Sequence, residues 1–403
     1  MKQLIFCLSG MLFLATQVMA QQPPEPPSPP NQNVVTVNRS TRTSTNKSKE
    51  TINIPMDSEQ GDAEGPEKTK TFSKSYSIDK NDKINIGNQF GSIVVKTWDK
   101  NEIKFDATIK AFALTDGEAQ SLLEDVSINS TKTGDLVTFK TEINQQKNGN
   151  WGSGSKNGKK WRREIKVDIT VYVPSTVSLT LAQHYGNITL GDFSGPTAFD
   201  IKYGSLTGGD LNNANNFISS QYSTTKFNNI NQAKIKQQFG NGLSITNIGT
   251  LDLEAQYAGV TINTIKNNGK IKLQYGRGIT IGSAGPLELN AQYASVKINS
   301  LRGNLTNRQQ FGKIAIESIE SSAKDVTIVA SYSDVSLGFS SSYSADFDAT
   351  ANFGKFSYGG NVTAKKLFDE KRYRSSKSYN GQIGSGGTNR LKVTSNFDNI
   401  TFR

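Results

Sequence analysis

An aromatic residue recurs about every 18 residues through the C-terminal half of the chain, and no other feature limits the possible folds as strongly. The series comprises Tyr185, Tyr203, Tyr222, Phe239, Tyr257, Tyr275, Tyr293, Phe311, Tyr332 and Phe353. Its successive steps are 18, 19, 17, 18, 18, 18, 18, 21 and 21 residues, and Phe397 continues the series after an insertion. A nearly fixed period of this size predicts stacked structural repeats.

Between the aromatic residues, apolar and polar side chains alternate with the two-residue period of a β-strand. The stretch 251–257 places Leu, Leu, Ala and Tyr on one side, and after a turn Val260 and Ile262 take the apolar positions. One such coil cannot bury its apolar side alone, but stacked coils can. We therefore expect an all-β protein, a parallel β-solenoid (β-helix) of about 18-residue coils, with the aromatic rings turned toward the core.

Stacking in register predicts which outward side chains lie opposite one another. Five residues before the aromatic, successive coils have Lys234, Asp252, Lys270 and Glu288. Three residues before it, they have Lys236, Glu254, Lys272, Asn290 and Arg308. Neighbouring coils lie about 4.8 Å apart, so this alternation of sign predicts ion pairs between coils. One residue before the aromatic lies a series for which we expect an amide ladder, namely Gln221, Gln238, Gln256, Gln274, Gln292 and Gln310.

The region before Tyr185 follows the repeat only once, at 84–98. Strands are then predicted over 103–112, 135–143 and 164–173, with a helix over 116–126. A stacked array needs a cap over its open edge, so we interpret these elements as a small α+β cap. His184 is the only histidine, and we interpret it as a solvated residue at the head of the glutamine series rather than a catalytic group or ligand.

The N-terminus has the pattern of a secretory signal, with Lys2 before an apolar core and Val-Met-Ala at 18–20 as a cleavage site. We expect an exported protein of the periplasm or outer cell surface, with no transmembrane segment in the mature chain. Cys7, the only cysteine, lies in this signal, so the mature chain has no thiol chemistry. The predicted organisation is a signal peptide at 1–20, a disordered Pro/Ser/Thr-rich linker at 21–71, the first coil and α+β cap at 72–176, and the β-solenoid at 177–403 with an insertion at 361–390.

A basic, tryptophan-containing segment at 144–163 is the most distinctive non-repeating part of the body. Its candidate ligand-binding residues are Trp151, Lys156, Lys159, Lys160, Trp161, Arg162 and Arg163. Glycine, tryptophan and cationic groups suit a loop that stacks on sugar rings or grips phosphates and sulfates. The alternative is a solvated hairpin loop whose tryptophans fold back on the cap. The insertion at 361–390 is also basic. With a formal net charge of +11 for the whole chain, these segments favour a polyanionic glycan or another envelope component as partner, and nothing indicates specific nucleic-acid binding.

Catalytic and metal-binding patterns are weak. Asp252 and Glu254 share a strand face but have lysines in the coils on either side, which favours ion pairing over catalysis. Asp192, Asp200 and Asp210 are not expected to share a column. No phosphate-binding loop, His/Cys metal spacing or Ser-His-Asp set occurs. We expect no cofactor and no metal, and we expect that the protein is not an enzyme.

Three stretches resemble the bacterial putative-adhesin β-solenoid family, a group of exported domains of largely unknown function. They are FGSIVVKTW (90–98), VYVPSTVSLTLAQHYGNITLGDFSG (171–195) and TSNFDNITF (394–402), and the resemblance covers roughly 72–403. It implies an adhesive or scaffolding module of a Gram-negative envelope and assigns no site residues. A carbohydrate-active enzyme, such as a polysaccharide lyase or hydrolase on a β-helix, is the alternative, and a purely structural periplasmic component is a third hypothesis.

Overall fold

The computed structural model describes residues 65–144, 151–156, 159–367 and 375–403. These residues form strands β1 to β24 and a single helix, which confirms the all-β class predicted from the sequence. They belong to one compact unit, Gly61–Arg403. The predicted signal peptide and nearly all of the predicted linker lie outside the described residues. No helix in the described part of the chain is long and apolar enough to cross a membrane.

The elements at the N-terminal end of this unit lie beside the first repeat. They are β1 (Glu67–Ser77), β3 (Glu102–Phe112), α1 (Asp116–Glu124), β4 (Val126–Thr133), β5 (Leu136–Ile143), β6 (Gly152–Lys156) and β7 (Lys159–Val173). The helix and the strands predicted at 103–112, 135–143 and 164–173 are confirmed. The Thr115 hydroxyl accepts a hydrogen bond from the Glu118 backbone N–H at 3.2 Å, an N-cap that fixes where α1 begins.

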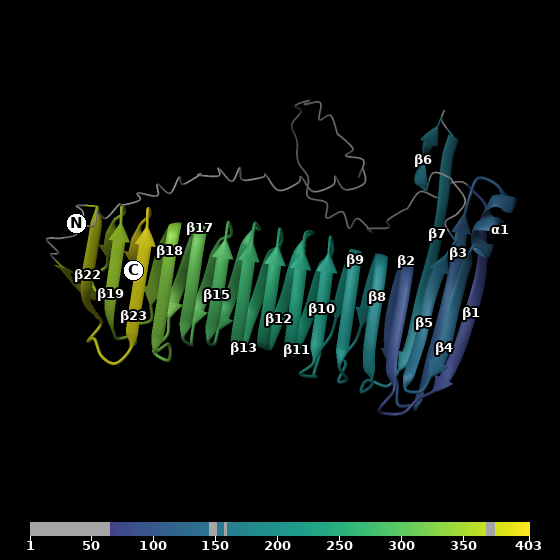
Figure 1. The fold of residues 1–403 in the computed structure, drawn as a ribbon, viewed down its shortest axis with the longest axis horizontal. Helices are drawn as coiled ribbons and strands as arrows, with labels where there is room; N and C mark the ends of the chain where they lie inside the picture. The colour runs from purple at the N-terminus through teal and green to yellow at the C-terminus, as the bar shows by residue number, and fades with distance from the viewer. Residues whose placement is uncertain (1–64, 145–150, 157–158, 368–374) are drawn as a thin grey trace, which may run out of the picture. The chain divides into compact units, whose positions relative to one another are not determined.

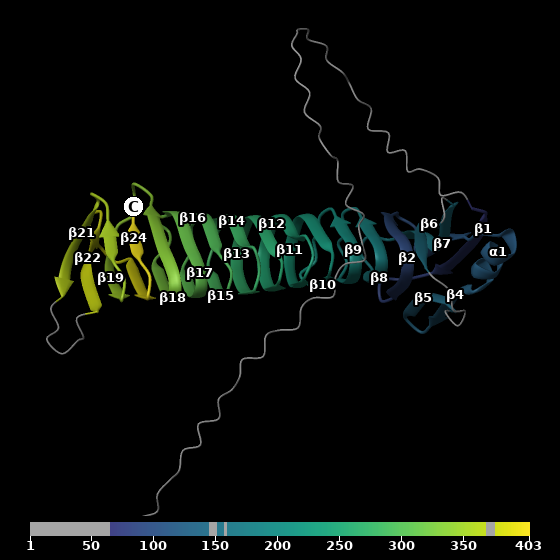
Figure 2. The ribbon, with the colours of Figure 1, turned by 90° about the horizontal axis from the view of Figure 1, so that it is seen from above.

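The first repeat is β2 (Lys83–Thr97), and it joins the N-terminal elements to the stacked parallel strands that follow. On one side β2 pairs in parallel with β5 and β7. On the other it pairs in parallel with β8 (Ser178–Leu190), over residues 95 positions further along the chain. Figures 1 and 2 show β2 between these groups, with α1 at the far end beside β1.

From β8 onward, parallel strands stack in sequence order (Figure 1). The strands are β9 (Thr197–Gly208), β10 (Asn216–Gln221), β11 (Thr224–Gln238), β12 (Gly242–Gln256), β13 (Gly259–Gln274), β14 (Gly278–Ala284), β15 (Leu287–Gln292), β16 (Val296–Leu301), β17 (Leu305–Ile319) and β18 (Asp325–Phe339). Lys234 lies opposite Asp252, and Asp252 opposite Lys270. The predicted 18-residue register is therefore confirmed, and we call each repeat a rung.

The core lies inside the stacked rungs and consists mainly of aliphatic side chains. Leu251, Leu253, Val260, Ile262 and Ile265 are each at most 4% exposed, as their alternation with polar residues predicts. Burying one such side chain fully contributes about 1.5–3 kcal/mol. Because the side chains of one rung rest on those of the next, the same burial also fixes the register.

The C-terminal end departs from sequence order. The outermost rung contains β19 (Ala345–Asn352) and β20 (Phe356–Tyr358), and it is followed by β21 (Val362–Leu367), β22 (Ser376–Ile383), β23 (Arg390–Asn396) and β24 (Ile400–Phe402). β23 pairs in parallel with both β18 and β19, so the last strands lie between two earlier rungs. The last strands of the chain are therefore not the last in the stack. Strand β22 covers the other edge of β19 in the antiparallel direction and pairs with β21.

Candidate functional site

The recurring aromatic residues form an outward-facing column. Twelve residues, which we call the ring column, have φ between 50° and 72°, namely Phe90, Tyr185, Tyr203, Tyr222, Phe239, Tyr257, Tyr275, Tyr293, Phe311, Tyr332, Phe353 and Phe397. In the described part of the chain no other non-glycine residue has a positive φ. The prediction that the rings turn toward the core is wrong, since Tyr185 is 52% exposed and Tyr257 is 38% exposed. The left-handed backbone reverses the side chain's direction, so the alternation that holds through Gln256 breaks at Tyr257.

Tight packing around the turn explains why this backbone occurs at each rung. Except after Phe397, the residue that follows the ring is small, and a Cβ on Gly204 would lie 1.7 Å from the Gly186 carbonyl oxygen. A left-handed residue that is not glycine costs about 1–2 kcal/mol. An aromatic pair contributes about 0.5–1.5 kcal/mol, and because each pair is shared by two rings, the column has about one pair per ring. Stacking therefore offsets a large part of the backbone cost.

The ring column exposes ring edges rather than ring faces. Successive centroids are 4.6–5.5 Å apart with planes within 15° of parallel, from Phe90 through Tyr332 to Phe397 and finally Phe353. At one end Trp151 stacks on Phe90 at 6.4 Å, and at the other Phe353 is 65% exposed. Along the column, each face is covered by a neighbouring ring. Solvent therefore meets a row of edges and tyrosine hydroxyls.

The predicted amide ladder runs beside the ring column. Gln221, Gln238 and Gln256 each donate from Nε2 to the Oε1 of the next glutamine, at 2.8, 2.8 and 2.7 Å. A further bond of 3.4 Å joins Gln292 to Gln310. His184 lies in the same column with Gln89 on one side and Lys202 on the other, so Gln89 rather than His184 is at its head. We call the six glutamines from Gln221 to Gln310 the amide column.

Within each charged series, residues of successive rungs lie opposite one another, as predicted. Lys236, Glu254, Lys272, Asn290 and Arg308 occupy successive rungs in register, and we call them the charge column. In the neighbouring series, Lys234 Nζ lies 3.8 Å from an Asp252 carboxylate oxygen. Exposed pairs of this kind contribute about 0–1 kcal/mol, so they specify register more than stability.

The basic segment singled out in the sequence is a pair of antiparallel strands, β6 and β7. Trp151 stacks on Phe90, and the Arg163 guanidinium lies 5.7 Å from the Trp151 ring centre. Arg162 Nε donates to Glu164 at 2.8 Å, and its guanidinium lies over the Phe112 ring at 3.5 Å. Trp151 thus folds back, as in the alternative of a solvated hairpin loop, but onto Phe90 of the first repeat rather than onto the cap.

The other candidates of this segment are described only in part. Trp161 is half-buried beside Gly154, whereas Lys160 is exposed. The side chains of Lys156 and Lys159, like residues 145–150 and 157–158, lie outside the described residues. Ligand binding by this segment stays a prediction.

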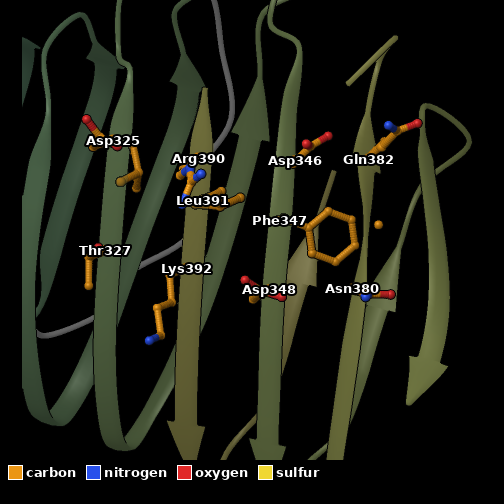
Figure 3. A pocket seen from close by; sticks show the side chains of 12 residues that line it. Asp325, Thr327, Asp346, Phe347, Asp348, Asn380, Gln382, Arg390, Leu391 and Lys392 are labelled. Carbon is orange, nitrogen blue, oxygen red and sulfur yellow. The ribbon is translucent and has the colours of Figure 1, made fainter. Parts of the chain in front are cut away.

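A groove of about 650 Å³ lies near the C-terminal end, over β18, β23, β19 and β22 (Figure 3). Its outward side chains form two rows across the strands. The first row contains Asp325, Arg390, Asp346 and Gln382, and the second contains Thr327, Lys392, Asp348 and Asn380. Each cation in the groove has at least one acid beside it in the register, so the charges of the groove are largely matched. Sequence order conceals this groove because β23 is inserted between β18 and β19.

Of the three aspartates not expected to share a column, Asp192 and Asp210 accept hydrogen bonds between rungs. Asp192 Oδ1 accepts from the Asp210 backbone N–H at 2.9 Å, and Asp210 Oδ1 accepts from Asn229 Nδ2 at 2.8 Å. Asp192 and Asp210 thus do share a column, contrary to the prediction.

Burial, with the nearby Asp334 carboxylate, raises the pKa of Asp398, which follows Phe397 in the ring column. Among the described residues, no three His, Cys, Asp or Glu side chains are grouped so as to hold a metal ion.

Comparison with known proteins does not assign the chain to a family. No protein-family model and no curated protein matches it. Similar solved structures include a putative cell adhesion protein from Clostridium sporogenes, at 10% identity over 83% of this chain and 99% of that one, with a TM-score of 0.15. A putative lipid binding protein from Parabacteroides distasonis is 10% identical over 83% of this chain and 96% of its own chain, with a TM-score of 0.25. A putative adhesin from Bacteroides fragilis is 10% identical over 83% of this chain and 97% of its own chain, with a TM-score of 0.22. Values this low support no argument about fold or function.

Proposed function

We propose that the chain is an exported, non-enzymatic parallel β-solenoid that acts as an adhesive or scaffolding module of a Gram-negative cell envelope. The observation that supports this most directly is the outward amide–ring pair, which recurs on successive rungs at one strand spacing. A partner that repeats along its own length can make the same contact at many rungs, and linked contacts raise the overall affinity. The preferred partner is therefore a linear polymer, and a polysaccharide offers hydroxyls to both the amides and the tyrosine edges.

Dependence of binding on polymer length tests this function. The mature protein would be titrated with linear polysaccharides of graded length, and turnover would be followed in the same samples. We expect affinity to rise with each added sugar until the polymer spans the amide column, with no product formed. The double variant Gln238→Ala/Gln256→Ala, which removes amide-column bonds, should bind several-fold more weakly.

The matched control is Asn267→Ala/Asn268→Ala, which also removes two side-chain amides, both of them exposed and away from the amide column. It should bind as tightly as the unmodified protein. Affinity that stops rising at one or two sugars would contradict a periodic binding surface. Absence of binding to every polymer would instead favour a purely structural component.

The C-terminal groove supports a carbohydrate-active enzyme as the second candidate. Asp346 and Asp348 lie two residues apart on β19, with a backbone separation of roughly 7 Å along the strand. Carboxylates projecting in parallel from this backbone would have a spacing like the range of about 6.5–9.5 Å between the carboxylates of inverting glycosidases. Release of new reducing ends from a polysaccharide, abolished by Asp346→Asn and by Asp348→Asn, would establish the enzyme and contradict the adhesive proposal.

A further inference from the structure

The charge column alternates in sign until Asn290. Lys236, Glu254 and Lys272 alternate as the register requires, but the next rung has a neutral amide where an acid would continue the pattern. Arg308 follows on the rung after Asn290. Two cations, two rungs or roughly 10 Å apart, therefore flank an uncharged side chain.

No carboxylate takes the place of the missing acid on the rung of Asn290. Lys272 has Glu254 opposite it on the preceding rung, whereas beyond Arg308 the next residue in the register is Val329. On the strand of Asn290 the nearest acid is Glu288, two residues earlier, and it lies opposite Lys270. Within the described ranges, no carboxylate oxygen lies within 4.0 Å of a side-chain nitrogen of Lys272 or Arg308. Both cations are exposed, so their charge is available to a ligand.

The amide column is interrupted at the same rungs. Gln256 donates to Gln274 at 2.7 Å, and Gln292 donates to Gln310 at 3.4 Å. Between them, Gln274 and Gln292 are aligned in register, yet no hydrogen bond joins their side chains. Within the described structure, Gln274 Nε2 consequently has no acceptor. A donor in this position is ready for an anionic oxygen.

A hollow coincides with these two breaks. It has a volume of about 220 Å³, and the polar side chains that line it are Lys272, Gln274, Asn290, Gln292, Arg308 and Gln310. The lining includes two cations and several amide donors but no acid.

We propose that this hollow binds one anionic group, a sulfate or carboxylate, of an acidic polysaccharide held along the amide column. Lys272 and Arg308 supply charge from the two flanking rungs, while Asn290 and Gln274 donate hydrogen bonds between them. Charge-assisted hydrogen bonds to an anion are stronger than neutral ones. The proposal rests on the proposed function, which it deepens by assigning acidic groups to the polymer.

The exposed ring edges favour an acidic polysaccharide over a single-stranded nucleic acid. Proteins that bind single strands stack the bases on open aromatic faces. Here Tyr275 is stacked on Tyr257 at 5.5 Å and on Tyr293 at 5.0 Å, so both of its faces are covered. Sugar hydroxyls need only the edge hydroxyls and side-chain amides.

The variant Asn290→Asp tests the site with almost no change in shape. It supplies the acid that the charge column lacks and should pair with Lys272 and Arg308. We expect binding of dextran sulfate to weaken about tenfold, while the thermal midpoint stays unchanged or rises. The control Asn263→Asp makes the same change of charge at an exposed position outside the hollow, and its affinity should stay within about twofold of the unmodified protein. Equal affinities for the two variants would overturn the site.

Further probes separate this site from the proposed function. Uncharged dextran of the same length should bind more weakly than dextran sulfate, and inorganic sulfate should shift the side-chain amide NMR signals of Asn290 and Gln274. If sulfate shifts these signals but neither polymer binds, the anion site holds and the polymer-binding function fails. If both polymers bind equally and Asn290→Asp has no effect, the function holds and the anion site fails. Tighter binding of an oligothymidylate of equal charge than of dextran sulfate would overturn the choice of polysaccharide.

Discussion

At the residue scale, the ring column places large aromatic side chains in a backbone conformation usually taken by glycine. Twelve residues from Phe90 to Phe397 have positive φ, a region that L-residues with a Cβ disfavour. Each inner ring is held there by stacking on rings one rung before and one rung after it. The aromatic identity therefore serves the turn, and the exposure of the ring edges is a consequence of that turn.

A pair of substitutions at Tyr257 tests this explanation. Both Tyr257→Ala and Tyr257→Gly lose stacking on Phe239 and Tyr275, but only glycine relieves the left-handed backbone. We expect the glycine variant to be more stable than the alanine variant by about 1 kcal/mol, measured as the difference in free energy of unfolding in urea.

Thr261, an exposed residue within β13 whose φ is not positive, provides the control. There the order should reverse, because glycine in a strand is less stable than alanine by about 0.5–1 kcal/mol. An alanine variant more stable than the glycine variant at Tyr257 would show that the turn is not under backbone strain.

The sequence predicted the period of the ring column but not the direction of its side chains. The prediction counted alternate residues from Leu253 through Ala255 to Tyr257 and placed them on one face of the strand. This assumes extended backbone at every residue, and the positive φ of Tyr257 breaks that assumption. A signal was present in the small residue that follows all of these aromatics except Phe397, as at Gly186, Gly204, Ala258 and Gly276. Such a residue indicates a crowded turn and so a special conformation beside it.

At the element scale, the insertion of β23 between β18 and β19, and of β24 between β18 and β20, was beyond prediction from the sequence. The apolar pattern of 391–402 identifies a rung, but it fits any neighbour with the same pattern. The 41-residue gap between Asp348 and Arg390 also lets the chain return past β21 and β22 to pair with an earlier strand. The groove in Figure 3 depends on this return, so its residues could not be grouped in advance.

Removing β23 and β24 should destabilise the earlier strands that pair with them as well as the chain end. A chain ending at Asn389 lacks β23, which pairs with both β18 and β19. We expect the 345–383 region to become at least about tenfold more sensitive to limited proteolysis, because local opening follows the loss of buried contacts. The rungs through β17 should stay protected.

The exposed substitution Lys392→Ala provides the control, since it keeps β23 and should leave protection unchanged. Full protection of 345–383 in the truncated chain would show that β19 does not depend on β23.

At the scale of the whole molecule, the unit Gly61–Arg403 repeats one rung many times, and its candidate binding features arise where the repeat departs from regularity. Asn290 interrupts the charge column, and β23 interrupts the order of rungs. The regular part follows from alternation and period, which a sequence displays. The irregular part depends on which residues become neighbours, and the sequence reveals this only once the register is known.

Distances between spin labels on introduced cysteines test the stacking most directly, because the mature chain is predicted to have no cysteine. From Lys234, the register places Thr306 four rungs away, Lys392 six and Asp348 seven. We predict separations of roughly 19, 29 and 34 Å at about 4.8 Å per rung, with position 392 nearer than position 348 despite its later place in the sequence. Distances that do not rise with rung number, or position 348 nearer than position 392, would contradict the stacked solenoid and its inserted final strands.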